Sequence, residues 1–374
     1  MAISSEWAWL PKELLDSILD KVASPFDKVR FGAVCKSWGI LVKERRRLKT
    51  QVAQTPMLLI PSKDNIKKTR SLYRITDRKI SGVKLPMPHN RRYCGSSFGW
   101  LSYVTKASFI TLFNPFRNAK IHLPQLQKLR GYRRYGNKYE YTVKKVTLSS
   151  DPASTPEDCL AMAIFGEFKD LAFVKLGDES WTYVEEDRTS VYADVMYFKG
   201  GQFLVLDHRS GLVSIDVNTN QKKILAPADL EYTERTYLVK TSSGNLLLVR
   251  RLIDSWPFGL SSQGMTSCFE VYKLVLDDES ERVVERVEVK NIGNDVLFLG
   301  DNQSISISAS HFPGCQPNSI YYTDDYIDTK PYYPNGPIDM GIFNLEDGSF
   351  RPHYKPNPAH KHMSPPIWIL PSML

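Results

Sequence analysis

The 374-residue sequence has few cysteines and no long apolar run. Its five cysteines are an odd number and include no Cys-x-x-Cys pair, so neither a disulfide framework nor a structural zinc site is expected. Reduced thiols are typical of the cytosol and nucleus. No segment approaches the roughly 18 apolar residues of a membrane span, and residues 1–11 lack the basic start of a secretory signal. These absences favour a nuclear or cytoplasmic protein without a membrane partner.

Motifs of the common enzyme classes are absent as well. The sequence has no P-loop, H-E-x-x-H helix or dinucleotide fingerprint. Two groups of possible metal ligands occur near the C-terminus, which are Asp324, Asp325 and Asp328, and then His353, His360 and His362. The aspartates are better explained as an ordinary solvated loop, because no Gly-marked calcium loop is present. The histidines are better explained as part of a polar surface loop between Pro352 and Pro366. The sequence therefore predicts a protein with no catalytic residues, metal or cofactor.

Charge is distributed unevenly along the chain. Residues 1–150 carry 30 Lys+Arg and 9 Asp+Glu, which is a net +21, whereas residues 151–374 carry 19 and 32, which is a net −13. A basic half can attract an acidic partner or nucleic acid. The charges are scattered rather than grouped in runs, which favours solvated flanks of a compact protein. Nucleic acid is therefore not the expected partner.

The first fifty residues have helical periodicity. Pro11 suits the first turn of a helix, and apolar residues then recur at three- and four-residue steps as one stripe: Leu14, Leu15, Ile18, Leu19 and Val22. A second start at Ser24 leads into further apolar positions, which Gly32 and Gly39 are expected to bend or split. A unit this small is marginally stable alone, so its large side chains could pack on another protein or on the rest of this chain.

Two segments of this region resemble the F-box. Residues 9–19 follow the opening pattern L-P-x-E-L-L-x-x-I-L, and residues 27–38 follow the closing pattern D-x-x-R-x-x-x-V-C-K-x-W. The resemblance implies a three-helix domain over residues 1–50 that binds the Skp adaptor of a Skp–cullin–F-box ubiquitin ligase. The positions implied to contact the adaptor are Leu10, Pro11, Leu14, Ile18, Leu19, Val34, Cys35 and Trp38.

From residue 53 onward the pattern changes to short apolar runs between turn residues, which is typical of strands. The runs repeat loosely: residues 99–104, 201–206, 244–249 and 318–322 share one shape, and residues 111–115, 214–218 and 341–345 share a second shape with an Asn-containing turn. Such repetition suits the blades of a β-propeller. About six or seven blades of roughly 40–50 residues fit residues 53–374, and six is the best division. A sandwich or two smaller β domains is the alternative.

The last apolar run, residues 367–371, is predicted to pair near residues 57–60 and so to close the ring. Residues 269–348 are similar to a plant F-box family with a C-terminal KIB-type β-propeller. The carriers of this similarity are residues 269–274, 296–300, 318–325 and 340–348. The predicted fold class is therefore multidomain α plus all-β, with a three-helix F-box followed by a β-propeller of about six blades.

Basic and aromatic residues alternate in the loop at residues 128–139. Its centre, Tyr132, Arg133, Arg134 and Tyr135, could contact an acidic protein segment, stack on nucleic acid or belong to an ordinary inter-strand loop. Taken together, the sequence predicts a non-catalytic substrate-recognition subunit that binds the Skp adaptor, cullin and a protein substrate of unknown identity. The alternative is a stand-alone propeller that binds proteins or nucleic acid without a ligase role.

Overall fold

The computed structural model divides the chain into two compact units, residues 1–54 with 372–374 and residues 55–371. The structure describes residues 10–22, 30–48, 55–61, 69–85, 87, 91–106, 108–127, 139–185, 190–254, 265–277, 279–325, 339–357 and 363–371. Among these residues, no helix has both the length and the apolar character needed to cross a membrane.

The helical unit contains α1 (Lys12–Lys21) and α3 (Lys36–Leu48) among its described residues. Its core consists of Leu15, Leu19, Phe31, Trp38, Leu41 and Val42. The rings of Phe31 and Trp38 lie with their centroids 4.2 Å apart. A Cβ on Gly39 would lie 3.0 Å from the carbonyl oxygen of Gly32. The two glycines that the sequence suggested as helix breakers therefore permit a close backbone contact.

The described strands of the second unit form six sheets. Blade 1 contains β25 (Ile367–Ile369), β1 (Met57–Pro61), β2 (Arg70–Arg74) and β3 (Lys79–Leu85). Blade 2 contains β4 (Gly95–Ser97), β5 (Trp100–Val104), β6 (Phe109–Asn114) and β7 (Ala119–Gln125). Blade 3 contains β8 (Val143–Leu148), β9 (Leu160–Phe165), β10 (Asp170–Lys175) and β11 (Thr182–Tyr183).

Blade 4 contains β12 (Tyr192–Lys199), β13 (Gln202–Asp207), β14 (Leu212–Asp216) and β15 (Gln221–Ala226). Blade 5 contains β16 (Arg235–Lys240), β17 (Leu246–Asp254), β18 (Met265–Leu276) and β19 (Val283–Glu288). Blade 6 contains β20 (Asp295–Leu299), β21 (Ile305–Ser308), β22 (Ser319–Tyr322), β23 (Gly341–Asn344) and β24 (Phe350–Arg351). Blade 6 departs from the others because β20 pairs with β22 in parallel.

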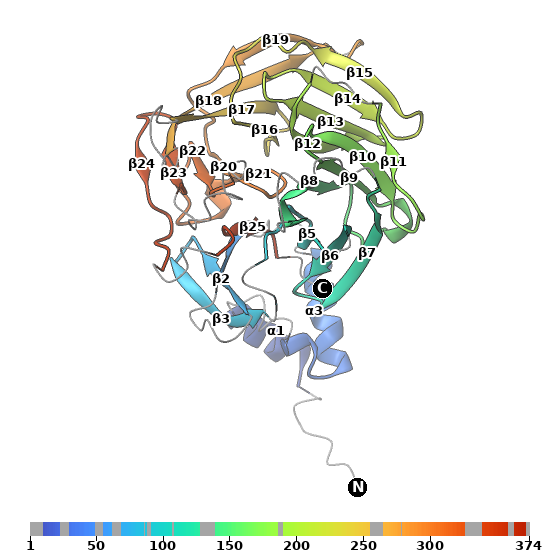
Figure 1. The fold of residues 1–374 in the computed structure, drawn as a ribbon. Coiled ribbons are helices and arrows are strands. Elements are labelled where there is room, and N and C mark those ends of the chain that lie inside the picture. The colour runs from blue at the N-terminus through green and yellow to red at the C-terminus, as the bar shows by residue number, and fades with distance from the viewer. Residues whose placement is uncertain are drawn as a thin grey trace. The chain divides into compact units, whose positions relative to one another are not determined.

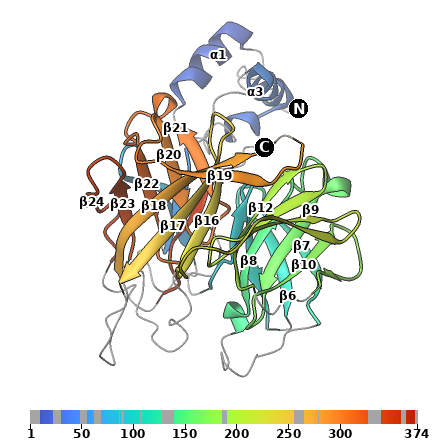
Figure 2. The same ribbon diagram turned by 90° about the horizontal axis from the view of Figure 1, so that it is seen from above.

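The six sheets stand around a common centre, with β8, β16 and β25 near it and β7, β15, β19 and β24 at the periphery (Figure 1). In the view turned by 90°, the strands run between the two open faces of the ring (Figure 2). The second unit is therefore a six-bladed β-propeller, as the sequence predicted, and not a sandwich.

The segments that repeat in the sequence occupy equivalent positions in different blades. A residue with positive φ lies one or two positions before β5, β13, β17 and β22, at Gly99, Gly201, Gly244 and Asn318. A left-handed residue suits a tight turn between two antiparallel strands. The Asn-containing turns are also equivalent, since Asn114 at the end of β6 and Asn344 at the end of β23 each accept a backbone N–H two residues later. Both predicted repeats are confirmed.

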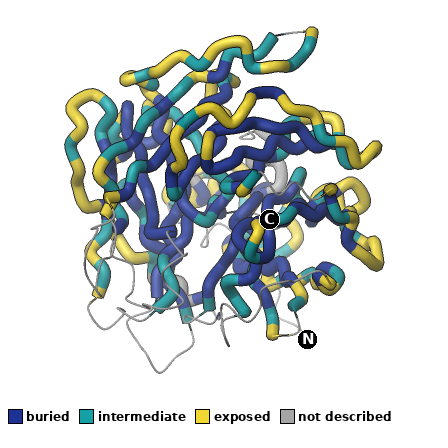
Figure 3. Tube along the Cα trace, turned by 45° about the horizontal axis from the view of Figure 1, so that its top comes forward, coloured by how far each residue is buried: buried dark blue, intermediate teal, exposed yellow. Residues whose placement is uncertain are grey.

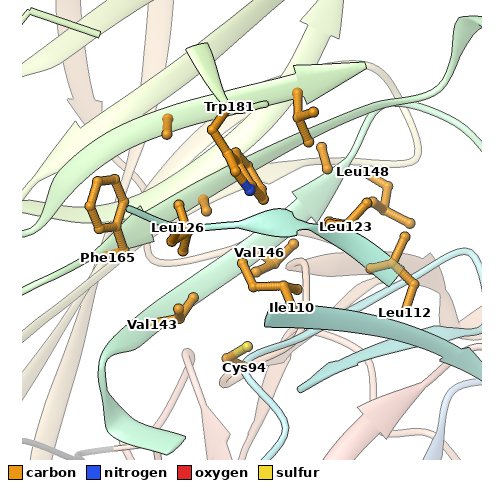
Figure 4. Packing of buried hydrophobic residues seen from close by; sticks show 14 of the residues in the cluster. Cys94, Ile110, Leu112, Leu123, Leu126, Val143, Val146, Leu148, Phe165 and Trp181 are labelled. Carbon is orange, nitrogen blue, oxygen red and sulfur yellow. The ribbon is translucent and has the colours of Figure 1, made fainter. Parts of the chain in front are cut away.

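The hydrophobic core lies between adjacent blades. Between blades 2 and 3, Ile110, Leu112 and Leu123 face Val146 and Trp181 across the two sheets (Figure 4). Comparable clusters fill the junctions of blades 3 and 4, 4 and 5, 5 and 6, and 6 and 1. Buried residues dominate the inner strands, whereas exposed residues concentrate on the turns and on outer strands such as β15 and β19 (Figure 3). Blades 3, 4, 5 and 6 are thus each packed against both of their neighbours.

The C-terminal run closes the ring. β25 pairs antiparallel with β1, with Leu58 opposite Trp368, which confirms the predicted pairing. Trp368 is fully buried, donates its indole N–H to the carbonyl of Leu299 at 3.2 Å and packs on Phe298 with ring centroids 5.1 Å apart. The closing strand therefore links blade 1 to blade 6.

His353 lies beside this junction and not in the polar surface loop that the sequence suggested. The imidazole is buried, Nε2 lies 3.0 Å from the carbonyl oxygen of Tyr322, and the ring packs on Trp368. Burial lowers the pKa of His353 to about 4, and the bond to Tyr322 offsets only part of that effect. The ring is therefore neutral in the folded protein at pH values where an unfolded chain would protonate it.

This histidine makes the propeller less stable in acid. Because the pKa is depressed in the folded state, only the unfolded chain takes up the proton between pH 6.5 and 4. We expect a loss of unfolding free energy of about 2 kcal/mol between pH 7 and pH 5 from this residue. Urea unfolding of the native chain and of His353→Gln across this range measures it, because shared carboxylate effects cancel in the difference. A stability difference that stays constant with pH contradicts the prediction.

Candidate functional site

The first candidate site is the outer surface of the helical unit. On α1, Leu15 and Leu19 are buried in the core, whereas Leu14 is 51% exposed and Ile18 is 37% exposed. Residues four apart lie on one face of a helix. The apolar stripe that the sequence indicated is therefore two stripes: one packs inside the unit and one faces outward. Val34, which precedes α3, is exposed as well, at 58%.

The eight positions implied by the F-box resemblance divide accordingly. Pro11, Leu14, Ile18 and Val34 are exposed, Leu10 and Cys35 are half-buried, and Leu19 and Trp38 are buried. Buried side chains support the outer surface and do not themselves face a partner. An exposed apolar residue that the sequence reasoning missed is Ile40 on α3, with 56% exposure. Ile40 lies in the apolar run from Trp38 to Val42, where the sequence alone does not show which side chains face outward.

Cys35 lies directly before α3 and packs partly against the helical core. Its Sγ is 3.0 Å from the hydroxyl oxygen of Ser37. This hydrogen bond, followed by one from the backbone N–H of Trp38, lowers the pKa of the Cys35 thiol. The propeller cysteines differ, because burial raises the pKa of Cys94 to about 12. All five cysteines are free.

The second candidate site is one face of the propeller, which we call the long-loop face. The three longest connections join strand ends on this face: those between β7 and β8, β22 and β23, and β24 and β25. Contacts between blades confirm that these ends meet, since Arg92 reaches both Val143 and Asp301, and Arg251 reaches Asp339. The first residue of β1 and the last residue of β25 lie at the opposite face.

A buried ion network lies under the long-loop face between blades 5 and 6. Arg251 is fully buried and donates to Asp325 and to Asp339, each at 2.8 Å. It also donates to the carbonyl of Thr323 at 2.9 Å, while Arg235 donates to the carbonyl of Asp325 at 2.6 Å. Asp324 and Asp325 are buried, so the expectation that they belong to a solvated loop is wrong.

A second arginine joins blades 2, 3 and 6. Arg92 forms a two-pronged ion pair with Asp301, at 2.9 and 3.2 Å. It also donates to the carbonyls of Val143 and Lys144 at 2.7 and 2.8 Å. Burial raises the pKa of Asp301, and Arg92 offsets part of that rise. Arg92 therefore links residues of three blades through its hydrogen bonds.

Lys145 and Asp194 form a third buried pair, on the innermost strands of blades 3 and 4. Asp194 Oδ2 also accepts the backbone N–H of Leu238 at 2.8 Å. Sequence reasoning did not identify β8, in which Lys144 and Lys145 interrupt the run of apolar residues. Among the described residues, no group of three His, Cys, Asp or Glu side chains could hold a metal ion.

The predicted contact residues Tyr132, Arg133, Arg134 and Tyr135 lie outside the described residues.

The fold defines a six-bladed β-propeller protein with an N-terminal helical unit. A model of the KIB1-4 beta-propeller family matches residues 72–344, and the chain belongs to this family. It is similar to the F-box protein SKIP23 of Arabidopsis thaliana, at 26% identity over 408 residues covering 97% of this chain and 95% of the relative. The F-box protein At2g17036 of the same organism is 23% identical over 403 residues, covering 98% and 95%.

A solved structure with a similar fold is TolB from Acinetobacter baumannii. It has a TM-score of 0.40 and 12% sequence identity, and the alignment covers 80% of this chain and 62% of TolB. The family match confirms the resemblance found in residues 269–348, and the whole-chain similarity to Arabidopsis F-box proteins extends it to the helical unit.

Proposed function

We propose that this protein is the substrate-recognition subunit of a Skp–cullin–F-box ubiquitin ligase. The observation that carries the proposal is the similarity to proteins named F-box proteins, which extends over both the helical unit and the propeller. In this role residues 1–50 form an F-box that binds the Skp adaptor, and the adaptor connects the chain to cullin. The propeller, within residues 53–374, binds a protein substrate.

The outer stripe of α1 supports this assignment. Leu14, Ile18 and Val34 place apolar area on the surface of a small unit, where solvent contact is unfavourable. A standard interface buries roughly 1,200–2,000 Å², and a few apolar anchors supply most of its affinity. Leu14 and Ile18 are the proposed anchors, while Leu19 and Trp38 hold the helices that present them.

The proposed contribution to ubiquitin transfer is proximity. In this proposed role the chain itself makes and breaks no bond. Holding a substrate lysine near the charged ubiquitin makes the transfer effectively intramolecular, which raises its rate without any acid or base from the recognition subunit. The ion pairs of Arg92 with Asp301 and of Arg251 with Asp325 and Asp339 link neighbouring blades, which suits a role that needs a fixed geometry.

Replacing both proposed anchors is expected to disconnect the chain from the ligase. In Leu14→Ala/Ile18→Ala, affinity for the purified Skp adaptor should fall by at least about 30-fold, because each truncated anchor removes apolar contact. Surface plasmon resonance with the full chain measures this, and a pull-down of adaptor together with cullin gives a second readout.

Ile224→Ala is the matched control, because Ile224 is 59% exposed on β15 of the propeller. It should bind the adaptor like the native chain. Trp38→Ala should lose adaptor binding together with helical circular dichroism, since Trp38 belongs to the core. Failure of the native chain to capture adaptor and cullin would refute the ligase role. Full adaptor binding by the double variant would contradict only the assignment of the α1 surface as the adaptor contact, and not the ligase role.

A further inference from the structure

Three exposed apolar side chains gather on the long-loop face at blades 3 to 5. Phe168 is 64% exposed in the turn between β9 and β10, Tyr232 is 56% exposed before β16, and Val191 is 39% exposed before β12. We call these three residues the Phe168 patch. Large exposed aromatic side chains on a rigid scaffold are typical of interaction surfaces.

A buried histidine joins the three segments that carry the patch. His208 Nε2 lies 2.7 Å from Lys169 Nζ, and Nδ1 lies 2.7 Å from the carbonyl oxygen of Thr233. The backbone N–H of His208 donates to the carbonyl of Val191 at 3.1 Å. Its ring stacks on Tyr232 with centroids 5.1 Å apart and planes inclined by 20°. The patch is therefore built on fixed turns, each held to the next.

The charges beside the patch are mainly negative. Glu167 precedes Phe168, and Glu231 and Glu234 flank Tyr232 and Thr233. In the described turns 166–169, 190–191, 208–211 and 227–234 the cations are Lys169, which is buried against His208, and Arg209. A fourth acid, Asp229, pairs with Arg286. Three further arginines, Arg235, Arg250 and Arg286, donate to backbone carbonyls of these turns, and each is also paired with an aspartate or glutamate. The turns that carry the two aromatic rings therefore hold three glutamates, Arg209 and arginines that already have carboxylate partners.

We propose that the Phe168 patch binds a Lys- or Arg-rich extended segment of a partner protein. Carboxylates complement the cationic groups, while aromatic rings accept both the apolar stems of Lys and Arg and their charges. Under the function proposed above, this partner is the ubiquitination substrate, and only that identification rests on the proposed function. The fixed turns favour binding because little ordering is needed when the segment docks.

The test is selection from a random 12-residue peptide library displayed on phage, with the full chain immobilised. Phe168→Ser/Tyr232→Ser serves as the counter-target. Selected peptides should carry net positive charge. The synthetic form of the strongest peptide should bind the double variant at least about tenfold more weakly. It should also bind Glu231→Lys/Glu234→Lys more weakly, with a smaller dependence on salt.

Phe98→Ser is the matched control, because Phe98 is 40% exposed in the turn between β4 and β5, on the opposite face. It should leave peptide affinity unchanged, and equal melting temperatures should show that all variants fold. Selection of acidic or uncharged peptides, or equal affinity for native chain and double variant, overturns the proposal. Adaptor capture measured in parallel separates the two hypotheses, since patch variants should keep it. If the chain selects no basic peptide but captures the adaptor, only the proposal that the Phe168 patch binds a basic segment is contradicted.

Discussion

Replacing Arg251 by methionine is expected to lower the unfolding free energy of the propeller by about 3–5 kcal/mol. Arg251 is fully buried and pairs with Asp325 and Asp339. Methionine fills much of the same volume, but it leaves two buried carboxylates without this cation. The cost therefore arises from unpaired charge rather than from a cavity. Urea unfolding followed by tryptophan fluorescence measures it.

Two further variants identify the cause. Arg351→Met makes the same change at an exposed position of β24, where an effect within about 0.5 kcal/mol is expected. Adding Asp325→Asn and Asp339→Asn to Arg251→Met should recover part of the lost stability, because neutral amides are less costly to bury than carboxylates. If the triple variant is less stable than Arg251→Met, unpaired charge is not the dominant cause.

Truncating Trp368 to alanine should open the ring at its closing strand, with a loss of about 3–5 kcal/mol. The indole is fully buried, packs on Phe298 and His353, and donates to the carbonyl of Leu299. Because β25 supplies only three residues to blade 1, few other contacts can compensate. Thermal unfolding and limited proteolysis at the C-terminal segment measure the effect.

Trp368→Phe is the graded control for this variant. Phenylalanine keeps most of the apolar contact but removes the indole N–H, so a loss of about 1–2 kcal/mol is expected. Equal losses for Phe and Ala would mean that the hydrogen bond, and not the packing, holds the strand. A loss below about 1 kcal/mol for Trp368→Ala would contradict the role of β25 as the closure of the ring.

Local patterns were enough to predict the architecture of the propeller. Strand runs, left-handed turn residues and Asx turns depend on residues close in sequence, so they gave the six blades and the pairing of β25 with β1. The burial of Asp325 could not be predicted, because its partner Arg251 lies 74 positions away. The environment of His353 depends on Tyr73, whose hydroxyl donates to the His353 carbonyl across 280 positions.

The candidate sites were predicted to different extents. Helical periodicity located α1, but it could not separate Leu14 and Ile18 from Leu15 and Leu19, because both pairs are apolar and four residues apart. Packing against Phe31 and Trp38 decides which pair is buried. The Phe168 patch gave no sequence signal, since its residues come from three turns that meet only in the folded ring.

The closing strand also determines when this protein can finish folding during synthesis. β1 leaves the ribosome long before β25, because Trp368 is translated 310 positions after Leu58. At roughly 5–20 residues per second, blade 1 keeps an open edge for roughly 15–60 s. During that time β1, which carries the side chains of Leu58 and Ile60 that are buried in the finished propeller, pairs with β2 on one side only. Its open edge could pair with other nascent chains. The yield of folded protein in a cell should therefore depend on chaperones that cover the nascent chain until its last strand is made.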